Sequence, residues 1–339
     1  MINVGVIGMG MMGLTHLDAY AKRDDVKVIA ISDRDPDRLS GKVKAQGNVE
    51  GQAQGGFDFS KPRKYEEGGD LIADEEVDVV DICLPTHLHV EYARAAMKAG
   101  KHVLVEKPLA RTSEDAAKLA AAAKRAKGIT MCAMCMRFWP GWSWLKQAID
   151  DRTYGRVYSA QFRRVASHPG GGFYSNGDLS GGAILDLHIH DTDFVHFLFG
   201  IPKAVTSVGY SKITTAVDHL VTQYHYEDVP LVVAEGGWAM ADKFPFGMSY
   251  TINFERATAV YQAGDKPLTL YEYGKEPRAV DLDSRMGYDI EIDYFIECIK
   301  KGTKPRTVTL TDAANTIAII EAEEKSVRTG KSVKVKVGK

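Results

Sequence analysis

Two segments of the chain carry residue types that could move a proton to or from a bound molecule. Glu106-Lys107-Pro108 follows the apolar run 103–105, which is short, β-branched and typical of a buried parallel strand. A lysine at that point lies at the carboxyl edge of a sheet, where open α/β sheets bind ligands. In a partly dry crevice the pKa of such a lysine can fall far enough for proton transfer. The alternative is a surface salt bridge at a strand end.

The second segment runs from Gly181 to Asp193 and crowds histidines and carboxylates together. Asp186 and His190 are four residues apart, so on one helix they share a face, where the carboxylate could hold the imidazole tautomer or share a substrate hydroxyl with it. A histidine is also the natural proton acceptor near neutral pH. A metal site is the weaker interpretation, because His188 and His190 diverge on a helix. A buried His–Asp pair is the structural alternative.

A glycine-rich turn near the start of the chain predicts dinucleotide binding. It matches G-x-G-x-x-G between a predicted strand and a predicted helix, and consists of Gly8, Met9, Gly10, Met11, Met12 and Gly13. The first glycine makes the turn, the second admits a pyrophosphate and the third lets helix and strand pack closely. The helix N-terminus adds N–H groups for the phosphates. Asp33 follows 20 residues after Gly13, where a carboxylate can bind both ribose hydroxyls; its alternative role is a helix N-cap.

The residues near Asp33 bear on which dinucleotide binds. A carboxylate repels a 2′-phosphate, which favours NAD, whereas Arg34 could stack on adenine or accept that phosphate, so NADP stays open. The loop after the third predicted strand reaches the same sheet edge. We expect it to line the nicotinamide ribose, with Thr86 also able to cap the next helix; its cofactor residues are Leu84, Pro85, Thr86 and His89.

Repeated strand and helix signals position these segments within the first 137 residues. Strands are expected at 4–7, 26–32, 77–84, 103–105 and 129–136, with helices at 14–22, 37–46, 88–99 and 113–127. This alternation predicts an α/β fold with a doubly wound parallel sheet. The Gly/Gln-rich stretch 47–60 is expected to be a loop.

The pattern changes after Arg137, where strand signals lengthen and alternate polar with apolar residues. Strands are expected at 157–165, 204–210, 219–226, 231–238, 249–254 and 257–261, and helices at 182–199, 288–301 and 311–329. Strands in series predict an antiparallel sheet, and hence a second, α+β domain.

Bulk properties exclude several classes of protein. The 339 residues suggest about two domains, and a net charge of −2 gives no basic surplus for nucleic acid. We expect no membrane span and no leader, since no run of 18 apolar residues or cleavage site is present. Four cysteines are too few for a disulfide framework and fit a cytoplasmic location. Cys132-x-x-Cys135 lies in an apolar run, so buried thiols are favoured over a redox or zinc pair, and no metal is expected.

The motifs together resemble the glucose–fructose oxidoreductase / inositol dehydrogenase / MocA family over nearly the whole chain. They are Gly8-x-Gly10-x-x-Gly13, Gly100-Lys101-His102-Val103-x-x-Glu106-Lys107-Pro108 and Gly181-Gly182-x-x-x-Asp186-x-x-x-His190-Asp191. The resemblance implies a Rossmann domain at 1–137, a substrate and oligomerisation domain at 138–304 on an open, mostly antiparallel sheet, and a closing helix at about 305–330 that returns to the Rossmann domain. It also implies a homodimer or homotetramer through that sheet.

The resemblance further implies an NAD(P)-dependent enzyme that interconverts a hydroxyl and a ketone or lactone on a sugar, cyclitol or related polyol. By motif position Lys107, Asp186 and His190 form the catalytic trio, and Arg137 falls where members contact the cofactor. Glu106 is a ribose-binding or lysine-positioning group.

A glycine-rich loop before the predicted Asp186 helix could close over a sugar through His168 and Tyr174, or could be a plain surface loop. Two other functions stay open for the chain. One is a redox-neutral lyase or glycosidase that uses tightly held NAD. The other is a non-catalytic NAD(P)-binding sensor.

Overall fold

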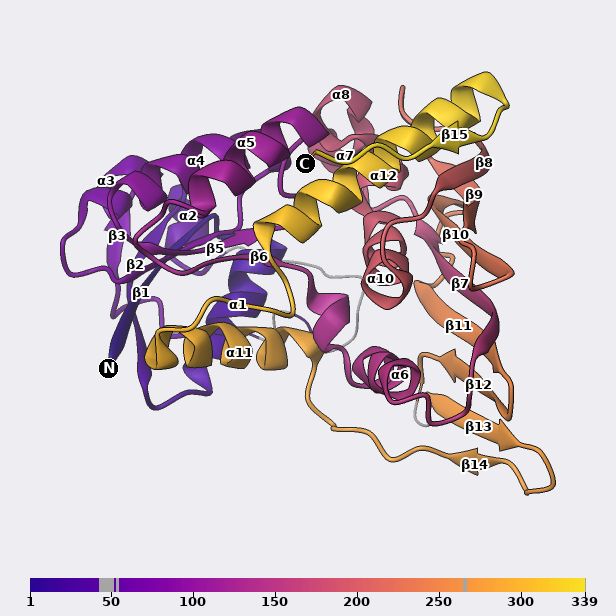
Figure 1. The fold of residues 1–339 in the computed structure, drawn as a ribbon. Coiled ribbons are helices and arrows are strands. Elements are labelled where there is room, and N and C mark those ends of the chain that lie inside the picture. The colour runs from indigo at the N-terminus through magenta and orange to yellow at the C-terminus, as the bar shows by residue number, and fades with distance from the viewer. Residues whose placement is uncertain (43–51, 53–54, 265–266, 339) are drawn as a thin grey trace. The chain divides into compact units, whose positions relative to one another are not determined.

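The computed structural model describes residues 1–42, 52, 55–264 and 267–338 (Figure 1). Half of the predicted Gly/Gln-rich loop 47–60, at 47–51 and 53–54, therefore lies outside the described residues. Contacts divide the chain into two units. The first joins Met1–Cys135 to Met286–Ala314, and the second joins Met136–Arg285 to the chain from Asn315 onward.

The first unit is built on a six-stranded parallel sheet in the order β3-β2-β1-β4-β5-β6. Its strands are β1 (Ile2–Ile7), β2 (Val26–Ser32), β3 (Arg63–Tyr65), β4 (Val79–Ile82), β5 (His102–Glu106) and β6 (Thr130–Ala133). Its helices are α1 (Met11–Ala21), α2 (Pro36–Leu39), α3 (Gly68–Ala73), α4 (Thr86–Lys98), α5 (Ser113–Ala123) and α11 (Gly287–Lys301). The predicted doubly wound sheet is confirmed, although β3 and α3 were not foreseen.

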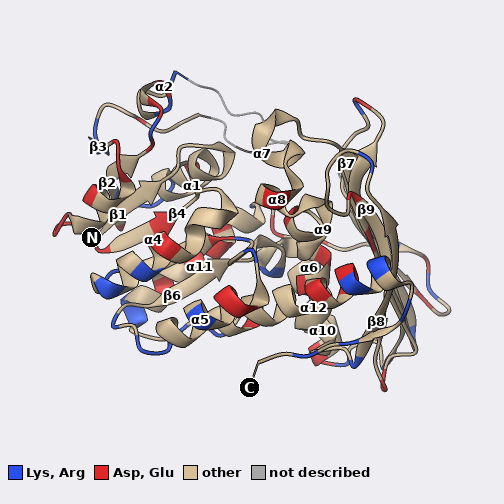
Figure 2. Cartoon of the chain, turned by 90° about the horizontal axis from the view of Figure 1, so that it is seen from above, with Lys and Arg blue, Asp and Glu red and all other residues tan. Residues whose placement is uncertain are grey.

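Apolar burial holds the centre of this sheet together. All four residues of β4 are buried, as expected for a parallel strand covered on both faces. One of them, Asp81, is a fully buried carboxylate. Charged residues of both signs lie instead along the helices, as Figure 2 shows for α4 and α5.

The glycine turn after β1 is required by packing at two of its positions. Gly8 has a φ of +96°, and a Cβ there would lie 2.5 Å from the carbonyl oxygen of Cys83. A Cβ on Gly13 would lie 1.9 Å from the carbonyl oxygen of Gly8. A Cβ on Gly10 meets nothing closer than 4.0 Å, so this glycine leaves open space at the start of α1.

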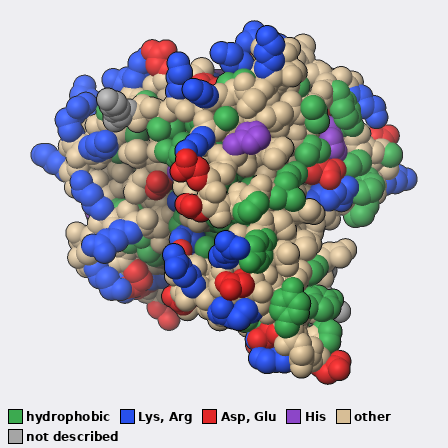
Figure 3. All heavy atoms as spheres, turned by 45° about the vertical axis from the view of Figure 1, so that its right-hand side comes forward, with side chains coloured by type: hydrophobic (Ala, Val, Ile, Leu, Met, Phe, Trp, Pro, Cys, Tyr) green, Lys and Arg blue, Asp and Glu red, His purple; other side chains and the backbone are tan. Residues whose placement is uncertain are grey.

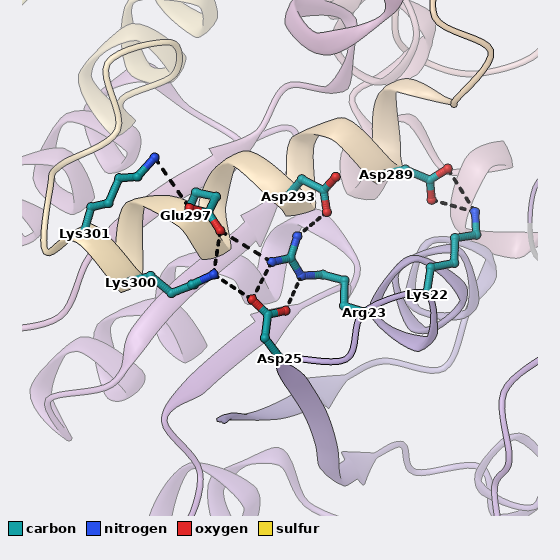
Figure 4. A network of polar contacts seen from close by, with 8 residues as sticks. All are labelled: Lys22, Arg23, Asp25, Asp289, Asp293, Glu297, Lys300 and Lys301. Atoms are coloured by element: carbon teal, nitrogen blue, oxygen red, sulfur yellow. Dashed lines mark hydrogen bonds and ion pairs between the residues drawn. The ribbon is translucent and has the colours of Figure 1, made fainter.

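Helix α11 packs against α1 through an ion-pair network (Figure 4). Arg23, just after the C-cap of α1, pairs with Asp25 at 2.9 Å and also with Asp293 of α11. Lys300 of α11 donates to the same Asp25 at 2.9 Å. Hydrogen bonds from Arg23 and Lys300 lower the pKa of Asp25 to about 2. The later segment that belongs to the first unit, Met286–Ala314, therefore begins with α11.

The return of the closing helix to the Rossmann domain stays a prediction, because the helix groups partly with each unit. Helix α12 (Leu310–Thr329) divides after Ala314, and its remainder belongs to the second unit. There Glu323 accepts a hydrogen bond from Thr192 at 3.1 Å, and Ser326 accepts one from the backbone N–H of Ser207 at 2.8 Å. These polar groups of α12 are buried, and their hydrogen-bond partners lie in the second unit.

The second unit contains a nine-stranded sheet in the order β14-β13-β12-β11-β7-β10-β9-β8-β15. Its strands are β7 (Val157–Ser167), β8 (Ala204–Tyr210), β9 (His219–His225), β10 (Leu231–Met240), β11 (Gly247–Phe254), β12 (Ala257–Gln262), β13 (Leu268–Glu272), β14 (Arg278–Ala279) and β15 (Val333–Lys334). All its pairings are antiparallel except β7 with β10. The predicted mostly antiparallel sheet is confirmed.

Helices cover one face of this sheet (Figure 1). They include α6 (Pro140–Asp150), α7 (Gly171–Ser175), α8 (Gly177–Ser180), α9 (Gly182–Asp186) and α10 (Ile189–Phe199), preceded by the 3-10 turn Cys135–Phe138. Residues of the other face, such as Val208, Gln223 and Thr251, are exposed. Figure 3 shows hydrophobic side chains at the surface among charged ones. Within the described ranges no helix has the length and apolar character needed to span a bilayer.

We predict that Gly13→Ala destabilises the protein by about 3 kcal/mol or more, because the new methyl group would overlap a backbone carbonyl that cannot move without shifting β1. Gly10→Ala is the matched control, since its Cβ enters open space. Urea unfolding of both variants checks this. Equal losses in the two variants would contradict the packing account.

Candidate active site

The segments predicted to bind a dinucleotide follow four neighbouring strands. In the order β2, β1, β4, β5, the strands are followed by Asp33, the glycine turn, the loop from Leu84 and Lys107. Because all four strands are parallel, these segments lie at one edge of the sheet. Parallel strands lie about 4.8 Å apart, so the row covers about 14 Å. A row of this length suits an elongated ligand bound across the carboxyl ends of the strands.

The glycine turn fits a pyrophosphate. Gly10 is the N-cap of the 11-residue helix α1, whose first turn has no acidic side chain and no side-chain cap among the described residues. The N–H groups and the positive dipole end of α1 therefore favour an anion there. The open space at Gly10 admits it, while Met9 is buried and Met11 and Met12 are partly exposed.

Asp33 is held beside this turn. Its Oδ2 accepts a hydrogen bond from the backbone N–H of Met9 at 2.8 Å, and its Oδ1 accepts one from the N–H of Asp35 at 2.9 Å. The alternative role as a helix N-cap belongs instead to Asp35, which accepts from the N–H of Asp37. The Asp33 carboxylate is thus fixed at the end of β2, where a ribose would lie.

A second arginine, which the sequence did not single out, lies beside Asp33. Arg38 has its Nη1 3.8 Å from Asp33 Oδ2, and the same atom lies 4.0 Å from the Cβ position of Gly10. Arg34, the predicted cofactor residue, is exposed and donates to Glu67 at 3.1 Å. Position along the chain favoured Arg34, but α2 brings Arg38 back over the glycine turn.

The loop after β4 is clamped by His89. The two ring nitrogens of His89 lie 2.7 Å from the carbonyl oxygen of Pro108 and 2.6 Å from that of Leu84. Burial lowers the pKa of His89, although two carbonyl partners favour ring N–H groups. His89 therefore ties the loop after β4 to the loop after β5. The expected capping role of Thr86 is wrong: Pro85 is the N-cap of α4, and Thr86 is buried in its first turn.

Glu106 lies directly below Lys107. Its Oε2 accepts a hydrogen bond from the backbone N–H of Lys107 at 2.9 Å. Its Oε1 lies 3.3 Å from Nε2 of His16 on α1. Glu106 is buried, whereas Lys107 is partly exposed. The ribose-binding or lysine-positioning role expected of Glu106 stays a prediction.

His16 belongs to a buried cluster that the sequence did not reveal. Its Nδ1 lies 2.8 Å from Asp81 Oδ2, and Cys83 Sγ lies 3.5 Å from the same nitrogen. Atoms of the three residues lie within 4.8 Å of one another, close enough to suggest a metal. The 2.8 Å contact is however a direct hydrogen bond, which leaves no room for an ion between the two atoms.

Asp186 and His190 lie in the second unit, and the single helix predicted for them is broken. Asp186 ends α9 and His190 lies in the first turn of α10. Between them, the N–H groups of Leu187 and His188 both donate to the carbonyl of Ala183. The continuous helical face expected for the pair is therefore wrong. Both side chains are partly exposed.

His188 lies at the break and is fully buried against β10. A Cβ on Gly236 would lie 2.2 Å from its Nδ1, so the glycine makes room for the ring. Burial, with the nearby charge of Arg164, lowers the pKa of His188 to about 3. His188 is therefore neutral and structural.

Two carboxylates after His190 anchor α10 through buried ion pairs. Asp191 accepts from Arg164 Nε at 2.8 Å, and Asp193 accepts from Arg137 Nε at 2.8 Å and from its Nη2 at 2.7 Å. Arg137 is buried and also lies over the ring of Phe197, with Cζ 4.6 Å from the centroid. Its observed role is to hold α10. The cofactor contact expected of Arg137 stays a prediction.

The rings of His168 and Tyr174, the expected substrate residues, both contact the ring of Trp238. Their ring centroids lie 5.2 Å and 6.0 Å from that of Trp238 on β10. Trp238 is itself held by a hydrogen bond from its Nε1 to Asp218 at 2.9 Å. Both residues are partly exposed, at the two ends of the glycine-rich stretch.

Comparison with known proteins identifies the family. A model described as an oxidoreductase family with an NAD-binding Rossmann fold matches residues 2–134, and the corresponding GFO/IDH/MocA C-terminal domain matches residues 142–260. The chain belongs to the Gfo/Idh/MocA family of oxidoreductases. The resemblance expected from the motifs is thereby confirmed, as are the NAD-binding Rossmann fold of the first domain and membership in an oxidoreductase family.

Relatives within the Gfo/Idh/MocA family match nearly the whole chain. It is 28% identical to myo-inositol 2-dehydrogenase of Thermotoga maritima, over 98% of both proteins. It is 30% identical to the rhizopine catabolism protein MocA of Rhizobium meliloti, over 94% of this chain and 93% of MocA. The solved structure of levoglucosan dehydrogenase with NADH and levoglucosan has a TM-score of 0.85 at 22% identity, over 98% and 99% of the two chains.

Some relatives are matched only in part. The chain spans 53% and 59% of the length of two further curated dehydrogenases that it matches.

We predict that Asp193→Asn destabilises the protein by about 3–5 kcal/mol, because it leaves the buried Arg137 guanidinium without the charge of Asp193. Glu227→Gln, which removes the exposed ion pair with Lys203, is the control and should cost about 1 kcal/mol or less. Urea unfolding measures both. A loss for Asp193→Asn no larger than that of the control would contradict the anchoring role.

Proposed function

We propose that this protein is an NAD-dependent dehydrogenase that interconverts a hydroxyl and a ketone or lactone on a sugar, cyclitol or related polyol. The observation that carries the proposal is the row of segments at one edge of the parallel sheet. It begins at Asp33, passes the open glycine turn and ends at Lys107. The names of the relatives, a myo-inositol 2-dehydrogenase and a levoglucosan dehydrogenase, support a polyol substrate.

The parts of the proposed cofactor site have separate tasks. The N–H groups of the glycine turn would hold the pyrophosphate, and Asp33 would hold the adenosine ribose. The loop after β4, positioned by His89, would line the nicotinamide ribose. When bound, the nicotinamide ring supplies a hydride acceptor at its C4 carbon.

The proposed proton transfer uses the other residues. Lys107 hydrogen-bonds the reacting hydroxyl oxygen and stabilises negative charge that develops there. His190 takes the hydroxyl proton on an imidazole nitrogen as the carbon gives up its hydrogen with the electron pair. Asp186 orients His190 or binds a neighbouring hydroxyl. His168 and Tyr174 are the proposed contacts to the rest of the polyol. The second-domain sheet, open on one face, is the proposed surface of a homodimer or homotetramer.

We predict that Lys107→Ala lowers turnover on an accepted polyol by about 10²–10⁴-fold, because the reacting oxygen loses its charged hydrogen-bond donor. The dissociation constant for NAD should change little, since the phosphates are held elsewhere. Steady-state kinetics and a titration of cofactor fluorescence measure the two quantities. Near-normal turnover would contradict the catalytic role of Lys107.

We also predict that Asp33→Asn weakens NAD binding by about tenfold or more while weakening NADP binding less, because the variant keeps the side-chain shape but removes the charge. Asp37→Asn is the control, since it neutralises an exposed carboxylate that pairs with Lys42 and should leave both affinities nearly unchanged. Titration of each protein with NAD and with NADP measures the two affinities. An unchanged ratio of the two affinities in Asp33→Asn would refute the role of Asp33 in cofactor choice.

A further inference from the structure

A cluster of ionisable side chains lies between α1 and the strands β4 and β5, and the proposed reaction does not use it. It contains His16, Tyr20, Asp81 and Cys83, with Glu106 beside it. His16 and Asp81 are completely buried. Burying ionised groups is costly unless they are paired, so their arrangement calls for a physical explanation.

The contacts of the cluster form a continuous path to Lys107. Asp81 Oδ2 accepts from Tyr20 at 3.0 Å and lies 2.8 Å from His16 Nδ1. On the opposite side of the ring, His16 Nε2 lies 3.3 Å from Glu106 Oε1, an ion-pair distance without hydrogen-bond alignment. The other oxygen of Glu106 receives the backbone N–H of Lys107.

The charges along the path alternate. Burial lowers the pKa of His16, but the charge of Asp81 and the hydrogen bonds to Asp81 and Cys83 outweigh it and raise the pKa well above its usual value. Burial raises the pKa of Cys83 and of Tyr20, so both stay neutral. The raised pKa favours the cationic form of His16, which lies between two carboxylates, one from β4 and one from β5.

We propose that His16 is a positioning residue for Lys107: it holds the Glu106 carboxylate under the Lys107 amide and offsets the negative charge of that carboxylate. The catalytic importance of His16 rests on the proposed function of Lys107. The electrostatic effect of His16 and Glu106 on Lys107 does not rest on it. If Glu106 lost this cation, its uncompensated charge would favour the ammonium form of Lys107. If Glu106 lost its own charge, the neutral amine would be favoured.

The link predicts shifts of opposite sign in the reactivity of Lys107. The measurement is the rate at which acetic anhydride acetylates Lys107 at pH 8. The full-length protein is labelled without substrate or cofactor, and mass spectrometry reports the modification at Lys107. Only the neutral amine reacts, and one pKa unit corresponds to about tenfold in rate. His16→Gln should slow labelling about threefold to tenfold, and Glu106→Gln should accelerate it by a similar factor.

Tyr20→Phe is the matched control, because it removes a hydrogen bond to the same Asp81 without touching Glu106. Its labelling rate should stay within about twofold of the unmodified protein. If His16→Gln does not fold, the double variant His16→Gln/Asp81→Asn removes both buried charges and should still slow labelling. In the unmodified protein, ¹⁵N NMR should find the His16 ring doubly protonated at neutral pH.

Changes of the same sign in His16→Gln and Glu106→Gln, no change in either, or a neutral His16 ring would overturn the proposal. A merely structural role would loosen the segment in both variants and accelerate labelling in both. Opposite shifts without turnover of any polyol would support the link and count against the proposed function instead.

Discussion

The close contact between Gly13 and the carbonyl of Gly8 is the constraint on which the first unit depends. It seats α1 directly on the end of β1, with no side chain between them. Three consequences follow along the same helix. Its N-terminus faces the open space at Gly10, its middle places His16 against Asp81 and Glu106, and its end places Arg23 against α11. A small shift of α1 would disturb all three at once.

In the second unit, buried charged and polar side chains fix the position of α10. After His190, α10 carries Asp191, Thr192 and Asp193, all buried. The two aspartates pair with arginines, and Thr192 donates to Glu323. Burial raises the pKa of Glu323 to about 8, so this carboxyl is largely neutral at pH 7. Buried pairs of this kind add less to stability than their number suggests, but each is costly to leave incomplete. They therefore restrict α10, and with it His190, to one placement.

Local patterns predicted much of this molecule because their physical causes are local. The glycine spacing works within one βα turn, and the alternating residues of β8 gave its bounds, Ala204–Tyr210, correctly. What the sequence could not supply are contacts between distant positions. Gly236 makes room for His188 at the break after Asp186, Glu323 of α12 accepts from Thr192, and Arg137 pairs with Asp193. The partnership of His16 with Glu106 likewise joins α1 to β5 and leaves no periodic signal.

The central claim is that the row from Asp33 to Lys107 serves net oxidation of a polyol. It is tested most directly by incubating the purified protein with excess NAD and a panel of inositols, sugars and anhydrosugars while the NADH absorbance is followed. The account predicts that at least one polyol gives NADH in large excess over the enzyme. NADH that never exceeds one equivalent per chain, with every polyol tried, would contradict it.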